Sequence, residues 1–123
     1  MRTFCTTSLD FRPVGVHNVL MKRVISLRRL REFWQRHPDA EVPLQAWYRV
    51  AKHAEWNSIR DVRQTYPDAD AVTAGSGATM TVFNIGGNKY RLITSIWYGG
   101  QQVYIKMVLT HAEYSKDRWK KQL

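Results

Sequence analysis

Three runs of β-branched and aromatic residues follow one another between residues 79 and 110, and they constrain the fold more than any other feature of this sequence. The runs are TMTVFN, KYRLITSIW and QVYIKMVLT, and the joints between them are IGGN and YGGQ. Such runs are typical of strands, and a Gly-Gly pair between two of them indicates a tight hairpin whose turn needs positive φ. The sequence therefore predicts three consecutive antiparallel strands.

The first glycine pair has a competing interpretation, because FNIGGNKYRLI (residues 83–93) places a lysine and an arginine directly after the glycines. A phosphate-binding loop of the Walker type needs Gly-x-x-x-x-Gly-Lys-Ser/Thr before a helix. A dinucleotide-binding fold needs Gly-x-Gly-x-x-Gly inside a βαβ unit. This stretch has neither spacing and is followed by a strand pattern, so we interpret it as a hairpin.

Turns at the glycine pairs fix a register between the last two strands. The residues that face one another across YGGQ are then Ile96 and Val103, Thr94 and Ile105, Leu92 and Met107, and Tyr90 and Leu109. Together with Phe83 they form an apolar face that the N-terminal helices should cover. The opposite face is mixed and carries Lys89, Arg91, Ser95, Tyr104, Lys106 and Thr110, with Met80, Val82, Ile93 and Val108 among them. Two rows of cations on one face favour an anionic partner, although simple solvation of an exposed face explains them equally well.

The N-terminal half predicts a strand and helices. KRVISL (22–27) is a candidate strand, and Ser26 is placed to cap a helix over 27–36. A second helix is expected to begin between Asp39 and Pro43 and to end near Ala54. Ser58 and Asp61 indicate a short third helix over 59–66, and TAGSGA (73–78) is expected to be a flexible connector. The predicted fold class is thus α+β, with the folded domain over 21–123 and residues 1–20 as a leader outside it.

The charge balance points to nucleic acid. Lys and Arg outnumber Asp and Glu by 19 to 10, which gives 123 residues a formal charge of +9. An excess of this size on a small domain favours an acidic partner. No run approaches 18 consecutive apolar residues, which makes a membrane partner the weaker interpretation. A lone cysteine, Cys5, rules out an intramolecular disulfide framework and fits a cytoplasmic setting.

The segment LTHAEYSKDRWKK follows the last strand and carries the second group of candidate residues. Thr110 and Glu113 have the spacing of a capping box, so they predict the start of a C-terminal helix. His111 and Tyr114 are three positions apart and would share one face of that helix. Because a helix N-terminus disfavours a cation, His111 would be a neutral proton acceptor. Ordinary surface packing is the alternative, and the scattered histidines (17, 37, 53 and 111) predict no metal site.

Taken together, VFNIGGNKYRLITSIWY and VYIKMVLTHAEY, after a helical half that begins MKRVIS, resemble the HigB toxins of type II toxin–antitoxin systems, within the RelE-like superfamily. The resemblance covers about residues 21–118. It implies an N-terminal strand and two to three helices packed on an antiparallel sheet, with a short C-terminal helix. It also implies an mRNA interferase that cuts messages on the ribosome without metal or cofactor, by attack of the RNA 2′-hydroxyl on the adjacent phosphate. The implied partner is a HigA-like helix-turn-helix antitoxin.

The resemblance also assigns roles to individual residues. Arg91 matches the family's strand arginine and would stabilise transition-state charge, Lys89 would bind phosphate, and His111 would transfer the proton with Tyr114 assisting. Weaker candidates for RNA binding are Lys106, Tyr104, Lys52 and His53. Two other functions stay open, namely a ParE-like toxin that inhibits DNA gyrase and an RNA-binding domain without catalysis.

Overall fold

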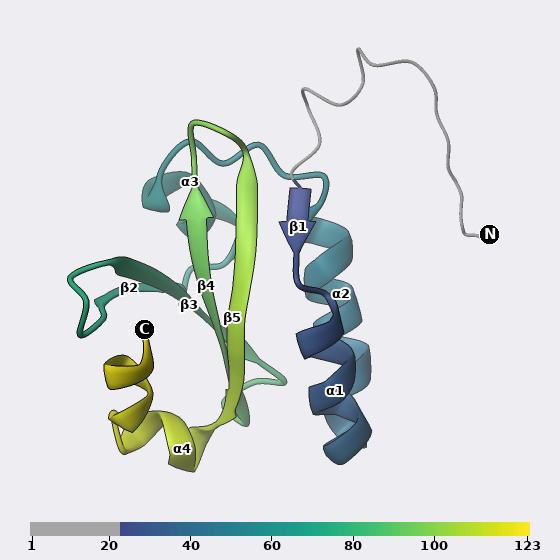
Figure 1. Cartoon of the computed structure of the whole chain (residues 1–123). Coiled ribbons are helices and arrows are strands. Elements are labelled where there is room, and N and C mark those ends of the chain that lie inside the picture. Colours follow the sequence, from purple (N-terminus) through teal and green to yellow (C-terminus); the bar gives the residue numbers. More distant parts are fainter. Residues whose placement is uncertain (1–22) are drawn as a thin grey trace.

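The computed structural model describes residues 23–123 (Figure 1). The expectation that residues 1–20 form a leader lies outside the described residues. The elements in chain order are β1 (Arg23–Ile25), α1 (Arg28–Arg36), the 3₁₀ turn η2 (Pro38–Ala40), α2 (Glu41–Ala51), α3 (Ile59–Thr65), β2 (Asp70–Thr73), β3 (Thr79–Ile85), β4 (Tyr90–Trp97), β5 (Gln102–Thr110), α4 (His111–Ser115) and the 3₁₀ turn η3 (Arg118–Gln122). The predicted α+β class is confirmed.

The strands form one sheet in the order β1-β5-β4-β3-β2. The predicted hairpins β3–β4 and β4–β5 are both present and antiparallel. The sheet as a whole is mixed, because β1 runs parallel to β5. Helices α1 and α2 lie side by side against one face, while α4 and η3 lie at the other side (Figure 1). The domain thus has a helical layer, a sheet and a small C-terminal layer.

A β-bulge corrects the predicted register. The pairs Ile96–Val103 and Thr94–Ile105 are as expected, but an irregularity between Ile93 and Thr94 shifts the rest by one residue. Beyond it Leu92 pairs with Val108 instead of Met107, and Tyr90 pairs with Thr110 instead of Leu109. A bulge inserts one extra residue into one strand, so side chains beyond it exchange faces.

The two faces of the sheet therefore hold two apolar clusters. The main core joins α1, α2 and the sheet, with Phe83, Trp47, Leu44 and Leu92 wholly buried. The second cluster lies on the opposite face and includes Met80, Val82, Ile93 and Trp119, with Met107 and Leu109 packed against it. The face that was expected to be open is thus partly covered by the C-terminal segment.

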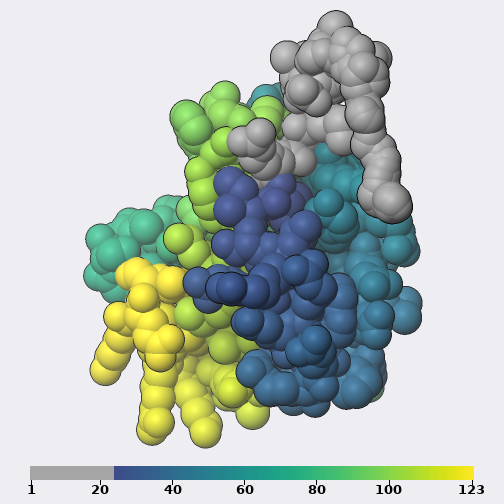
Figure 2. Space-filling model, turned by 45° about the vertical axis from the view of Figure 1, so that its right-hand side comes forward, coloured from purple at the N-terminus to yellow at the C-terminus, as the bar shows by residue number. Residues whose placement is uncertain are grey.

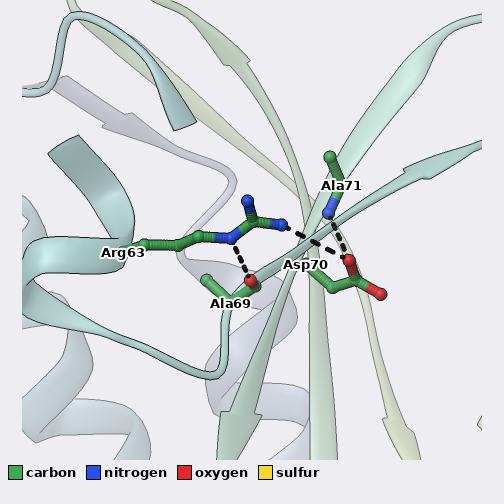
Figure 3. A network of polar contacts seen from close by, with 4 residues as sticks. All are labelled: Arg63, Ala69, Asp70 and Ala71. Atoms are coloured by element: carbon green, nitrogen blue, oxygen red, sulfur yellow. Dashed lines mark hydrogen bonds and ion pairs between the residues drawn. The ribbon is translucent and has the colours of Figure 1, made fainter. Parts of the chain in front are cut away.

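The sequence missed strand β2, which pairs with β3 from Asp70 to Thr73. Arg63 of helix α3 contacts the start of β2. Its Nε donates to the carbonyl of Ala69 at 3.0 Å, and its Nη2 lies 3.6 Å from Oδ1 of Asp70, the first residue of the strand (Figure 3). The expected flexible connector 73–78 is instead the tip of this hairpin. Its Gly75 amide donates to the carbonyl of Lys120 at 2.8 Å, which ties the tip to η3.

Two helix starts also differ from expectation. Ser26 does not cap α1: it adopts a positive φ of 74°, and Leu27 is the N-cap residue with no side-chain hydrogen bond. Ser58 is the N-cap of α3, but its side chain makes no capping bond; Asp61 instead accepts from the Asn57 amide at 2.9 Å. Tertiary packing of the apolar stripe therefore fixes these helices more than local capping does.

The glycine-rich turns are longer than the two residues predicted. Four residues, 86–89, separate the paired residues Ile85 and Tyr90, and both Gly86 and Gly87 have positive φ, at 63° and 72°. In the second turn, 98–101, Gln101 takes the positive φ of 53°. Only the first glycine pair therefore supplies the positive φ angles that the sequence indicated for both turns.

Replacing Gly87 by alanine tests this requirement. A Cβ at this position would meet no atom within 4 Å, so the whole cost is that of the left-handed backbone. We expect a loss of about 1–2 kcal/mol in unfolding free energy, measured by urea denaturation. Asparagine tolerates this conformation better, so Gly87→Asn should be milder, and equal stability of all three proteins would contradict the argument.

Candidate active site

The start of α4 meets the β3–β4 turn at one end of the sheet. The His111 amide donates to the carbonyl of Lys89 at 2.9 Å. The predicted capping box is present: Thr110 Oγ1 accepts from the Glu113 amide at 3.2 Å, and Glu113 Oε1 accepts from the Thr110 amide at 2.9 Å. These backbone contacts bring His111 and Tyr114 to the turn that leads into Arg91.

Arg91 is buried, with 8% of its surface exposed, and does not lie in an open row of cations. Its Nη1 donates to the carbonyls of Asn88 and Tyr90, each at 3.2 Å, and its Nη2 donates to Asn88 Oδ1 at 3.3 Å. The guanidinium also lies 5.5 Å from the centre of the Tyr114 ring, in cation–π geometry. Arg91 is therefore a fixed, partly desolvated positive charge.

The C-terminal segment supports the ring of Tyr114. Trp119 stacks on it at 5.3 Å between ring centres, and Trp119 Nε1 donates to the Tyr114 carbonyl at 3.1 Å. Burial raises the pKa of the Tyr114 hydroxyl. The phenol therefore keeps its proton at neutral pH. His111, one turn earlier, is exposed to solvent.

Lys89 and Arg91 do not project together, which corrects the strand alternation expected from the sequence. Lys89 lies in the turn before β4, and its Nζ forms an ion pair of 3.0 Å with Asp39 at the start of the α2 region. The Tyr90 hydroxyl donates to the other oxygen of the same carboxylate at 2.5 Å. Lys89 is thus directed toward the helical layer and Arg91 toward the C-terminal layer.

The Asp39 contacts predict a pH dependence of stability. The hydrogen bond from Tyr90, with that from Lys89, lowers the pKa of the Asp39 carboxyl below its ordinary value of 3.8. A carboxyl with a lowered pKa stabilises the fold above the pKa of the unfolded state and loses that contribution as pH falls through the folded one. Asp39→Asn should therefore lower the melting temperature at pH 7, and the difference from wild type should close below about pH 4.

Thermal unfolding between pH 2 and pH 7 measures this difference. Asp68→Asn is the matched control, because Asp68 is an exposed carboxylate on the same layer. A difference between Asp39→Asn and wild type that is unchanged across this pH range would contradict the assignment.

The weaker candidates fall into two places. Tyr104 and Lys106 lie together on β5, with Lys106 Nζ 5.9 Å from the Tyr104 ring centre. Lys52 caps the C-terminal end of α2, with its Nζ 5.0 Å from the ring of Tyr48, and His53 follows it. That end lies beside the β4–β5 turn, because Gln101 Nε2 donates to the Trp56 carbonyl at 2.8 Å.

The two ends of the sheet lie one strand length apart, as β4 shows. It spans about 23 Å from Tyr90 to Trp97 at ~3.3 Å per residue. The structure therefore brings Lys89, Arg91, His111 and Tyr114 to one end and leaves Lys52 and His53 at the other.

Sequence reasoning missed three supporting residues, Asn88, Asp39 and Trp119. Asn88 lay inside the quoted turn, but nothing in the pattern showed that its side chain would accept from Arg91. Trp119 carried a signal, since a tryptophan in an otherwise polar C-terminal tail indicates a packed tail. Asp39 had no signal, because it meets Lys89 across fifty positions of sequence.

Comparison with known proteins identifies the family. The model of the HigB toxin family, described as the RelE-like toxic component of a toxin–antitoxin system, matches residues 40–117. The chain belongs to the HigB toxin family. The match runs from α2 through α3 and β2 to β5 and ends after α4, so it contains all four candidate catalytic residues of this HigB-type toxin.

Curated relatives agree with this assignment at modest identity. The chain is 27% identical over 93 residues to the mRNA interferase HigB of Escherichia coli O6:H1 (strain CFT073), which covers 76% of the chain and 88% of the relative. It is 24% identical over 91 residues to the mRNA interferase toxin HigB of Escherichia coli K12 and to the mRNA interferase HigB of Shigella flexneri, covering 74% of the chain and 86% of each relative.

Two searches of residues 23–123 bear on the site. No helix in this part of the chain is long and apolar enough to cross a membrane. No three His, Cys, Asp or Glu side chains in it gather into a group that could hold a metal ion.

Proposed function

We propose that this HigB-type toxin is an mRNA interferase that cleaves messages on the ribosome in the cytoplasm. The observations that carry the proposal are the packing of Arg91 against Tyr114 and the contact of the His111 amide with the Lys89 carbonyl, where the β3–β4 turn meets α4. The names of the curated relatives support the same activity. The net charge of +9 supports binding to ribosomal and messenger RNA through phosphates.

The proposed reaction uses the RNA as its own nucleophile. His111 accepts the proton of the 2′-hydroxyl, the 2′-oxygen bonds to the adjacent phosphorus, and the bond from phosphorus to the 5′-oxygen breaks. The products are a 2′,3′-cyclic phosphate and a 5′-hydroxyl, whose proton comes from the protonated Tyr114 phenol. The reaction is metal-independent, because cationic side chains meet the charge on the phosphorane.

We assign to Arg91 the stabilisation of the negative charge on the phosphorane. Because only 8% of its surface is exposed, a phosphate can reach only a small part of this side chain. A charge held rigidly in a partly dry site stabilises a transition state more strongly than one in water. Lys89 is exposed on 66% of its side chain and binds a neighbouring phosphate, after leaving Asp39 or while still paired with it.

The experiment is induction of the toxin followed by mapping of RNA 5′ ends and a gyrase supercoiling assay. We expect cuts in translated messages, and we expect His111→Ala to reduce them by about 10²–10⁴-fold because a proton acceptor is lost. The control is Arg60→Ala, an exposed arginine on α3.

Two results would contradict the proposal. Intact messages with trapped gyrase–DNA cleavage would assign a ParE-like function. RNA binding without cuts, and with a steep salt dependence, would indicate a non-catalytic RNA-binding domain. We also propose a HigA-like helix-turn-helix antitoxin as the partner of this toxin.

A further inference from the structure

A groove of about 470 Å³ lies between α1 and α2, on the side of the molecule that faces the viewer in Figure 2. Its apolar part is formed by Leu27, Leu30, Trp34 and Tyr48, which are buried or half-buried. Arg31 and Arg49 also line it and are exposed. The groove therefore combines an apolar surface with flanking cations, and none of the candidate catalytic residues lies in it.

A second groove continues the first toward β1. It shares Leu27 and Arg31 with the first and adds Arg28 and Arg29. No acidic residue lines either groove within the part of the chain that the structure describes. Two carboxylates lie beside it: Glu32 is 3.5 Å from Arg28, and Glu41 accepts from the Gln45 side-chain amide at 3.3 Å. The residues that line the two grooves nevertheless carry a net positive charge.

An exposed apolar side chain borders the same surface. Val42 is 72% exposed, and it is one of the three large hydrophobic residues that are exposed within residues 23–123. It lies on α2, three positions before Gln45, which lines the groove. Residues three positions apart share one side of a helix. Exposed apolar groups beside a polar rim are typical of a protein–protein contact.

We infer that this groove is the docking site of an acidic amphipathic helix of the cognate antitoxin. Apolar side chains of such a helix would fill the groove, and its Asp and Glu would meet Arg31 and Arg49. The inference rests on the antitoxin partner of the proposed function and is independent of the ribonuclease activity.

Charge argues against the other occupants. Residues 1–22 contain three basic side chains and one acidic side chain, and a second copy of the chain carries +9. Both would be repelled by the arginines. An RNA would match the cations but has no aliphatic side chains to pack on Val42 and on the apolar lining of the groove.

The test measures the affinity of the full-length toxin for the antitoxin purified from its natural gene pair. Arg31→Glu/Arg49→Glu should weaken binding by at least about 100-fold and make it less sensitive to salt. Val42→Asp should weaken it by about 10-fold, because it adds a negative charge and removes an apolar contact while leaving the fold unchanged. The matched control is Arg60→Glu/Lys121→Glu, which makes the same charge change at two exposed positions elsewhere.

The variants are also assayed for melting temperature and for cleavage of translated mRNA. We expect Arg31→Glu/Arg49→Glu to melt as the control does and to cut mRNA while escaping neutralisation. Antitoxin affinity equal to that of the control would overturn the inference. Lost cleavage with retained antitoxin affinity would also overturn it and would assign the groove to RNA. A third result would separate the two proposals. If the wild-type chain cuts no RNA but binds the antitoxin through the groove, only the proposed ribonuclease activity is wrong.

Discussion

Arg91→Ala is expected to lower the rate of mRNA cleavage by about 10²–10³-fold, the usual cost of removing one transition-state contact. The guanidinium is held by Asn88, Tyr90 and the Tyr114 ring, so alanine removes a positive charge with a fixed position. Single-turnover cleavage on programmed ribosomes measures the rate directly. Growth arrest after induction provides an independent readout.

Two further variants separate charge from position. Arg91→Lys keeps the charge but cannot make the forked contact with Asn88, so it should restore only part of the rate. Asn88→Ala keeps the guanidinium and removes one acceptor, so its loss should be smaller than that of Arg91→Ala. An Arg91→Ala protein that melts like wild type and is fully toxic would refute the assignment.

Phe83→Ala is expected to have the largest effect on stability, a loss of about 3–5 kcal/mol in unfolding free energy. Phe83 is wholly buried, and its ring centre lies 5.4 Å from that of Trp47, 5.9 Å from Trp56 and 5.3 Å from Tyr66. Alanine would leave a cavity among three large rings that cannot collapse to fill it. A domain of this size has about 5–15 kcal/mol in total, so the variant would be close to unfolding at 37 °C.

Urea denaturation of Phe83→Ala and of the control Val42→Ala measures this cost. Val42 is a hydrophobic residue with 72% of its surface exposed, and its truncation should change stability by less than about 0.5 kcal/mol. Equal urea midpoints for the two variants would show that the aromatic cluster is not the centre of the core.

Much of the candidate site could be predicted because its determinants are local. The capping box needs only Thr110 and Glu113 at the right spacing, and it places His111 and Tyr114 on α4 wherever that helix packs. The glycine pair likewise needs only its own backbone freedom to form the turn before β4. Strand β2 was missed for the opposite reason, since DAVT is short and its first residue is held by a contact with Arg63 in α3.

The register of β5 shows where local reasoning fails. Lys106, Met107 and Val108 offer an apolar side chain to either face, so a period of two cannot reveal which one turns inward. The bulge buries Val108 in the main core and places Met107 against the second cluster.

The sequence by itself determined the α+β class, the antiparallel hairpins and the C-terminal cap that places His111 and Tyr114 on α4. Tertiary structure alone decided that Arg91 is buried against Tyr114 and that Lys89 turns to Asp39. Turns and caps are set by neighbours along the chain, whereas the surroundings of a charge are set by segments that only folding brings together.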